Sequence, residues 1–325
     1  NWGPTGFAPP GMFASASSAE HVKWYRALGV NAIQTFCVSC CGYAWFRSDV
    51  APVEPGMQGD FLKEMVALGH KDGMKVLGYF CVGSNTHWGK TNPELSHGSP
   101  SSIHIPLTDA YVDYFCASVK DALVKTDCDG FMLDWFFSAV PGGWDFSKPK
   151  IRSSGPWLAC EKQLYQQLLG EPFPGEKNLQ SDKELEYHRR AVERCWSRIR
   201  QTAKATKPGC ILWLSCYDLD HHQVAGSQLL REIDWLMNEN PNPKSLEHAR
   251  KASGPQTKII QCVCGWGDQH DADRLIRDLR SQDVGFYGFA KADEKTTLPA
   301  TAGKDPVSVG NAKNIEIMRK AFRAE

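Results

Sequence analysis

The sequence lacks any apolar run of the roughly 18 to 20 residues that a helix needs to cross a bilayer. It also lacks an excess of charge of either sign, because 37 Lys and Arg residues balance 37 Asp and Glu residues. A basic surface for nucleic acid or anionic lipid is therefore not expected. No G-x-G-x-x-G or P-loop motif follows an expected strand, so no nucleotide cofactor is predicted. The chain is expected to have no membrane span, no nucleic-acid partner and no cofactor.

A disulfide framework is also not expected, although the chain has twelve cysteines. Several of them lie inside apolar segments expected to be strands, where cysteine behaves as a small buried apolar residue: Cys37, Cys81, Cys262 and Cys264. Cys37 also begins a Cys-x-x-Cys-Cys run that resembles half of a zinc site. No second Cys/His pair at a suitable spacing follows, so no metal is predicted there.

Signals for a cellular compartment are few. The sequence has no Asn-x-Ser/Thr sequon, which gives no support to a eukaryotic secreted origin. It begins at Asn1 rather than at Met, which is consistent with a removed leader and favours a periplasmic or secreted protein. The cysteines without evident partners leave the cytoplasm as the alternative.

Apolar strand patterns alternate with helical patterns along the 325 residues, which predicts βαβ units and a parallel sheet. The expected strands are residues 6–13, 32–40, 75–82, 130–136, 211–216, 233–237, 258–264 and 284–289. The expected helices are residues 18–28, 60–72, 110–125, 183–206, 244–252, 272–281 and 311–323. Eight such units predict an α/β protein in which residues 1–325 form a single (β/α)8 TIM barrel, with residues 138–182 as a loop insertion after strand four. The competing fold is an open doubly wound sheet.

The most informative segment is residues 129–137, Asp-Gly-Phe-Met-Leu-Asp-Trp-Phe-Phe. Asp129-Gly130 is a turn signal, and the next three residues form the apolar run of a strand that is covered on both faces. The strand would end at Asp134. In a (β/α)8 barrel this end of the strand faces the catalytic mouth. A structural ion pair with a Lys or Arg is the alternative role for this carboxylate.

The other expected strand ends bring carboxylates, amides and aromatic rings to the same mouth. Candidate sugar-binding residues are Tyr43, Trp45, Asn85, His87, Trp88, Trp135, Trp266, Asp268 and Lys291. Carboxylates placed among aromatic side chains are typical of glycoside hydrolysis, in which one attacks the anomeric carbon and the other protonates the leaving oxygen. Glu239 is the first candidate for the proton donor, and Asp218 is the next. A loop cap for Glu239 and a turn for Asp218 are the alternative roles.

The segment that ends at Asp134 resembles the Asp-Gly-hydrophobic-x-hydrophobic-Asp segment of retaining α-glycosidases with (β/α)8 barrels. The similarity is greatest to the α-L-fucosidase-like group, glycoside hydrolase family 29. In that family the Asp closing strand four is the nucleophile, so the resemblance implies this role for Asp134. The chain departs from the family at strand three, where a His-His-Asp-Gly run is typical and residues 84–88 read Ser-Asn-Thr-His-Trp.

The expected function is therefore a retaining exo-α-glycosidase acting on an oligosaccharide or glycan, with oligomeric state unspecified. Two alternatives remain open. One is a non-catalytic carbohydrate-binding barrel that lacks the second carboxylate. The other is a metal-dependent barrel hydrolase or isomerase, with Asp218, Asp220, His221 and His222 as the candidate ligands.

Overall fold

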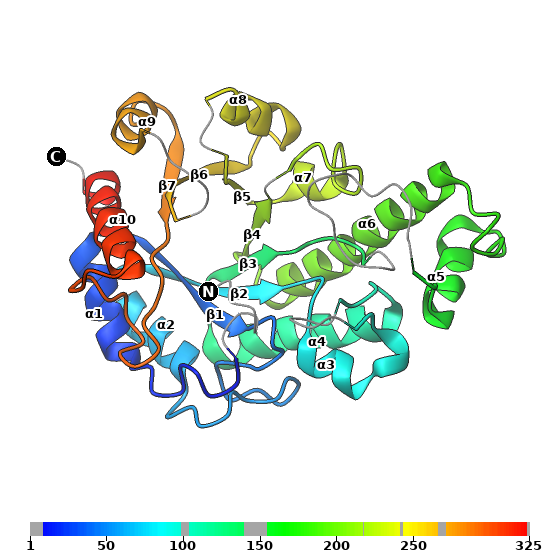
Figure 1. Ribbon diagram of the computed structural model, residues 1–325, viewed down its shortest axis with the longest axis horizontal. Helices are drawn as coiled ribbons and strands as arrows, with labels where there is room; N and C mark the ends of the chain where they lie inside the picture. The colour runs from blue at the N-terminus through cyan, green and yellow to red at the C-terminus, as the bar shows by residue number, and fades with distance from the viewer. Residues whose placement is uncertain are drawn as a thin grey trace.

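The structure is a computed structural model that describes residues 9–98, 104–139, 155–216, 218–240, 243–265 and 271–323. Its centre is one curled sheet of seven parallel strands, hydrogen-bonded in chain order from β1 to β7 (Figure 1). The strands are β1 (Ala32–Val38), β2 (Lys75–Cys81), β3 (Gly130–Asp134), β4 (Ile211–Cys216), β5 (Trp235–Asn238), β6 (Lys258–Cys264) and β7 (Val284–Gly288). Sequential parallel pairing of this kind is the strand order of an α/β barrel.

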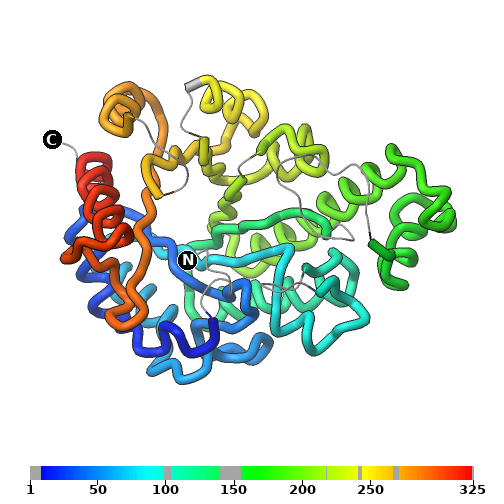
Figure 2. The backbone as a smooth tube through the Cα atoms, in the orientation of Figure 1, coloured from blue at the N-terminus to red at the C-terminus, as the bar shows by residue number. Residues whose placement is uncertain are grey.

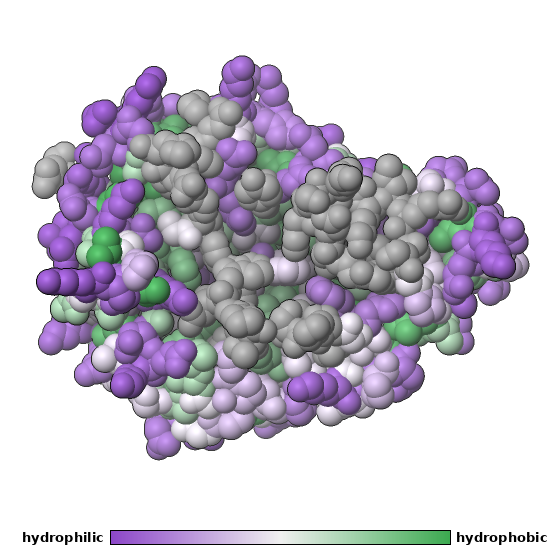
Figure 3. All heavy atoms as spheres, viewed as in Figure 1, coloured by the Kyte–Doolittle hydropathy of each residue, from purple (hydrophilic) through white to green (hydrophobic). Residues whose placement is uncertain are grey.

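Helices surround the sheet, and the backbone trace passes outward through a helix between successive strands (Figure 2). They are α1 (Ser18–Leu28), α2 (Phe61–Lys71), α3 (Thr86–Thr91), α4 (Asp109–Thr126), α5 (Ala159–Leu169), α6 (Ser181–Thr206), α7 (Gln228–Glu232), α8 (Pro243–Ala252), α9 (Ala272–Leu279) and α10 (Pro306–Phe322), with a short 3-10 helix at Pro93–Leu95. Charged and polar side chains gather around the periphery of the face shown in Figure 3. Among the described residues no helix is both long and apolar enough to cross a membrane.

Two apolar layers result from this arrangement. The larger lies between the sheet and the helices and includes Phe80, Phe131 and Trp196, all nearly inaccessible to solvent. A smaller cluster fills the inside of the curl: Cys40, Leu77, Tyr79, Cys81, Met132, Trp213, Met237, Ile260 and Cys262. Because strand side chains alternate between faces, the inward-pointing residues of β2 to β6 meet inside the sheet.

Strand β3 is fixed at its start by the Asp-Gly pair that precedes its apolar run. The carboxylate of Asp129 accepts hydrogen bonds from the Val76 backbone N–H at 2.7 Å and from His70 at 2.8 Å. A Cβ on Gly130 would lie 1.9 Å from the carbonyl oxygen of Ile211, so only glycine allows β3 and β4 to approach this closely. The register that follows places Leu133 beside Leu214, and Asp134 at the end of the strand.

The predicted α/β architecture is confirmed in its coarse form, with seven of the eight expected strands present in the described residues. The prediction of a strand at residues 6–13 is wrong for its described part, because residues 9–13 form turns. Gly11 and two prolines in this stretch favour turns over extended pairing. Residues 6–8 lie outside the described residues. The sixth expected strand begins two residues later than predicted, at Trp235.

The expected loop insertion at residues 138–182 also needs correction. Helix α5 occupies Ala159–Leu169 within it and buries Leu164 and Tyr165, whereas residues 140–154 lie outside the described part of the chain. Pro and Gly residues flank this helix on both sides, so the sequence predicted a loop where a helix of three turns lies. Helices α3 and α7 were likewise not predicted.

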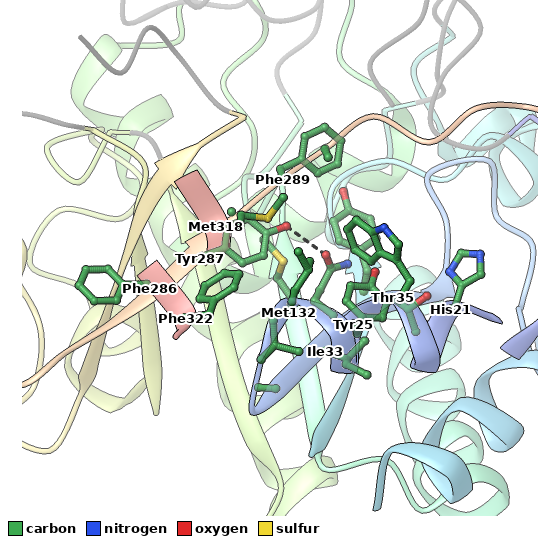
Figure 4. Close-up of a pocket in the computed structure, with 18 of the residues that line it drawn as sticks. His21, Tyr25, Ile33, Thr35, Met132, Phe286, Tyr287, Phe289, Met318 and Phe322 are labelled. Atoms are coloured by element: carbon green, nitrogen blue, oxygen red, sulfur yellow. Dashed lines mark hydrogen bonds between the residues drawn. The ribbon is translucent and has the colours of Figure 1, made fainter. Parts of the chain in front are cut away.

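Strands β1 and β7 are the two edges of the sheet within the described residues. A side-chain hydrogen bond links them, from the Tyr287 hydroxyl to Gln34 Oε1 at 3.2 Å. A cavity of about 460 Å³ lies between these strands and the helices α1 and α10, and Tyr25, Phe286 and Met318 line part of it (Figure 4). This gap is where an eighth strand of a closed barrel would lie.

Candidate active site

Asp134 is the last residue of β3, and its carboxylate is bound on both oxygens. The Tyr79 hydroxyl on β2 donates to Oδ2 at 2.8 Å, and the backbone N–H of Trp135 donates to Oδ1 at 2.9 Å. The hydroxyl of Ser215 on β4 also interacts with this carboxylate. Three donors from three different strand ends therefore hold Asp134 in one orientation at the carboxyl edge of the sheet.

The residue after Asp134 has an unusual backbone conformation. Trp135 has a φ of 53°, a left-handed value that is costly for a bulky residue. The backbone N–H of Gly83 donates to the Trp135 carbonyl at 2.9 Å, and the Phe137 N–H donates to the same oxygen at 2.8 Å. A Cβ on Gly83 would lie 2.7 Å from that carbonyl, so a glycine is needed opposite the turn. Strain of this kind is typical of functional sites.

Glu239 follows β5 directly, and its position is set by two neighbouring strands. The hydroxyl of Ser215 lies 2.5 Å from Glu239 Oε1. The side-chain amide of Gln261 on β6 donates to the carbonyl of Asn238 at 3.1 Å and to that of Asn240 at 3.2 Å. Gln261 is 1% exposed and thus holds the backbone on both sides of Glu239. The Asn238 amide returns a hydrogen bond to Gln261 Oε1 at 2.7 Å.

The two carboxylates are close to each other because both contact Ser215. Two O–H···O hydrogen bonds through one hydroxyl group keep the outer oxygens within roughly 6 Å of each other. Burial raises the pKa of Asp134 to about 6, although hydrogen bonds from Tyr79, Trp135 and Ser215 oppose the shift. Burial and the negative charge of Asp134 raise the pKa of Glu239 to about 7. The pair is thus expected to hold one proton near neutral pH, and Glu239 is the carboxyl that keeps it longer.

The predicted sugar-binding residues before β3 divide into two groups. Tyr43 and His87 are partly exposed at the rim, with their rings 5.2 Å apart. Three others have positions inside the fold: Trp45 packs on Phe36 and Phe61, Asn85 caps helix α3, and Trp88 packs on Tyr111. Their exposed fractions of 2%, 3% and 8% leave little surface for a ligand.

The remaining predicted residues lie elsewhere. Trp135 is partly exposed beside Asp134, and its ring is 6.2 Å from that of His104. Asp218 is exposed and accepts the backbone N–H of Asp220 at 3.0 Å, the geometry of a turn residue. Lys291 is exposed after β7, where its backbone pairs with the Asn311 side chain. Trp266 and Asp268 lie outside the described residues.

The alternative metal site at Asp218, Asp220, His221 and His222 has no geometric support. Within the described ranges no group of three or more His, Cys, Asp or Glu side chains is placed to hold an ion. The rings of His221 and His222 lie 4.3 Å apart at an angle of 33°, and burial lowers the pKa of His222 to about 4.

Three residues that position the carboxylates were not predicted: Tyr79, Ser215 and Gln261. Each is a polar residue inside an otherwise apolar strand, with exposed fractions of 3%, 5% and 1%. A buried polar side chain is costly unless it is hydrogen-bonded, so a polar position in a buried strand was the signal available in the sequence.

A barrel-like fold with two neighbouring carboxylates at the carboxyl edge of the sheet is an arrangement that glycoside hydrolases use. The sequence profile of the family described as "Hypothetical glycosyl hydrolase 6" matches residues 17–135, which run from the N-cap of α1 to the residue after Asp134. No curated protein sequence matches the chain. The family match and the barrel-like fold together support glycosidase activity.

Solved structures with a similar fold include α-L-fucosidase isoenzyme 2 from Paenibacillus thiaminolyticus, with a TM-score of 0.63 and 15% identity over 94% of this chain. This chain spans only 45% of that enzyme. The PgaB (BpsB) glycoside hydrolase domain from Bordetella bronchiseptica has a TM-score of 0.63 and 13% identity, with 98% of this chain and 96% of that one covered. A maltogenic α-amylase, AmyB from Thermotoga neapolitana, has a TM-score of 0.50 and 10% identity, covering 98% of this chain and 75% of the enzyme. At these identities the likeness concerns the fold alone.

Proposed function

We propose that the protein is a retaining glycoside hydrolase in which Asp134 is the nucleophile and Glu239 is the acid/base residue. Asp134 attacks the anomeric carbon as Glu239 gives its proton to the leaving oxygen, and the glycosidic bond breaks. Glu239, now ionised, then takes a proton from a water molecule that attacks the same carbon. The ester bond to Asp134 breaks, and both carboxyl groups return to their first protonation states.

The observation that supports this proposal best is the contact of both carboxylates with Ser215. A separation of about 5 to 5.5 Å is typical of retaining glycosidases, whereas inverting enzymes leave roughly 6.5 to 9.5 Å for a water molecule. Two hydrogen bonds through one hydroxyl group keep the nearest carboxylate oxygens within roughly 6 Å, below the range of inverting enzymes. The short separation therefore favours direct attack by a carboxylate.

The division of roles follows from the hydrogen-bond donors. Asp134 receives donors from Tyr79 and from the Trp135 backbone, which stabilise its ionised form. Glu239 has Ser215 as its described donor, and its pKa of about 7 lies above that of Asp134. An ionised nucleophile beside a protonated acid is the state that a retaining glycosidase needs at the start of its reaction.

For the substrate we propose a glycan cleaved from its end, with an α-L-fucoside as the first to be tested. The resemblance of the β3 segment to family 29 supports this choice. The test is hydrolysis of a panel of aryl α- and β-glycosides, with the anomer of the first product determined by NMR. Release of the inverted anomer would contradict the retaining mechanism, and a β-glycoside as the sole substrate would contradict the α-specificity.

The nucleophile has a more direct test. A 2-deoxy-2-fluoro glycosyl fluoride of the preferred sugar should form a stable ester with the attacking carboxylate, and peptide mass spectrometry should locate it at Asp134. Glu239→Gln should still be labelled, because the fluoride leaves without protonation. A label on Glu239 or Asp218 would overturn the assignment.

A carbohydrate-binding barrel without activity, the first alternative from the sequence, predicts no second carboxylate near Asp134. The proximity of Glu239 to Asp134 through Ser215 favours the enzyme instead.

A further inference from the structure

Ser215 reaches both carboxylates from the strand between them. It is the penultimate residue of β4, the strand that pairs with β3 on one side and β5 on the other. The register places Leu214 beside Leu133, so Ser215 is level with Asp134 on β3. On the other side Ser215 pairs with Met237, two residues before Glu239, whose carboxylate contacts the serine hydroxyl. Its 5% exposure excludes most solvent from the hydroxyl group.

A serine hydroxyl has a single proton and two lone pairs, so it can donate to only one carboxylate at a time. Its oxygen lies 2.5 Å from Glu239 Oε1 and also interacts with Asp134. When one carboxyl is protonated, that group can donate to the serine oxygen while the serine donates to the ionised group. Rotation about the Cβ–Oγ bond exchanges these two arrangements without moving any heavy atom.

We propose that Ser215 is a positioning residue whose hydroxyl group donates its hydrogen bond to whichever of Asp134 and Glu239 is ionised at each stage of the reaction. This inference rests on the proposed function. Before attack, Asp134 is ionised and Glu239 is protonated, so Ser215 donates to Asp134 and accepts from Glu239. After the glycosyl ester forms, Asp134 is uncharged and Glu239 is ionised, so Ser215 donates to Glu239. The serine proton stays on its own oxygen, and no proton passes through it.

Burial favours the neutral form of the other titratable side chains that face Asp134 and Glu239. The titratable groups that face it are Tyr79 and Cys81 on β2, Cys216 on β4 and Tyr287 on β7, and burial raises the pKa of each above its usual range. Cys40 after β1 contacts the Tyr79 hydroxyl at 3.8 Å, and Asp218 after β4 is exposed. The buried negative charge that faces Ser215 is therefore assigned to Asp134 and Glu239.

Titration of the two carboxyl groups by site-resolved carbon-13 NMR of the full chain, without substrate, tests the shared hydroxyl. Ser215→Ala should raise the pKa of Asp134 by roughly one unit, because its ionised form loses a hydrogen bond, and should lower the pKa of Glu239, because its protonated form loses the oxygen that accepts its proton. Ser215→Thr keeps the hydroxyl and should restore both values. Tyr79→Phe removes a donor from Asp134 alone and should raise mainly that pKa. A Ser215→Ala variant with an unchanged pKa for either carboxyl would overturn the proposal.

The pH dependence of kcat/KM on the best aryl glycoside supplies the second readout. In Ser215→Ala the acid limb of the bell-shaped profile should move to higher pH and the basic limb to lower pH, only the acid limb should move in Tyr79→Phe, and Ser215→Thr should match the wild type. A merely structural role of Ser215 would lower activity without moving the limbs, which would refute the positioning role. Absence of all glycosidase activity would instead contradict the proposed function, and the NMR titration remains interpretable in that case.

Discussion

The two sides of the sheet differ in how their strands are joined and in how their polar groups are paired. On the carboxylate side, formed by β2 to β5, the ladder is continuous and Tyr79, Ser215 and the Trp135 backbone hold the carboxyl groups. On the gap side, formed by β1 and β7, a side-chain hydrogen bond between Tyr287 and Gln34 links the strands beside a cavity of about 460 Å³.

The comparison shows that the cavity and the pair of carboxylates do not coincide. The cavity is lined mainly by apolar side chains, and its lining extends to Tyr79 and Trp213 on the carboxylate side, but neither Asp134 nor Glu239 belongs to it. The indole N–H groups of Trp45 and Trp213, which line the cavity, are buried with no partner in the described structure. Catalytic groups need fixed donors and a low-dielectric setting, and those conditions are met on the carboxylate side. The site is therefore identified by its hydrogen bonds rather than by the size of an opening.

The largest expected effect concerns Asp134. Asp134→Asn should lower kcat at least about a thousand-fold, because a nucleophile is required in the chemical step and amides do not replace it. Asp218→Asn is the matched control. It removes an exposed carboxylate after β4 and should change kcat less than about three-fold. Equal losses in the two variants, measured on the same aryl glycoside, would break the distinction between the pair and its neighbours.

A smaller loss of kcat is expected when Gln261 is replaced, and Gln34 on the opposite side of the sheet provides the matched control. Gln261→Met removes the amide that holds both carbonyls around Glu239 and should lower kcat about ten- to a hundred-fold, since a misplaced acid transfers its proton poorly. Gln34→Met is the same substitution on the gap side and removes only the bond to Tyr287. It should change kcat less than about two-fold. A larger loss in Gln34→Met would show that the gap side also positions the reacting groups.

The position of Asp134 could be predicted from sequence because the information is local. A turn signal, three apolar residues and a carboxylate are consecutive, and they specify a buried strand ending in a charge. Glu239 was predictable as a strand-end residue for the same reason. The contact of both with Ser215 could not be predicted, because it depends on the register of β3, β4 and β5, which no single segment contains.

The aromatic and amide residues show the limit of the same approach. Trp45 and Trp88 follow strands as a sugar-binding tryptophan would, yet both pack into the core. A large ring suits either environment, and only the tertiary structure decides between them. Asn85 follows β2 as a ligand would, but its side chain accepts the Trp88 N–H at 2.8 Å as a helix cap. A capping residue and a polar ligand use the same atoms, so the sequence does not separate them.

The smallest expected effect is on stability, and it has the opposite sign to the effect on activity. The pKa of Asp134 rises to about 6 and that of Glu239 to about 7 on folding, so the folded chain binds these protons more tightly than the unfolded chain. Their favourable contribution to the free energy of unfolding is complete below the unfolded pKa of about 4 and is lost as pH rises to about 7.

Asp134→Asn removes the charge and should raise the melting temperature by about 2 to 4 °C at pH 8, with no gain at pH 4. Tyr287→Phe on the gap side should give a change independent of pH. Calorimetry of both variants at the two pH values checks this, and a gain at pH 4 equal to that at pH 8 would mean that ionisation of the buried Asp134 carboxyl is not the cause of the gain.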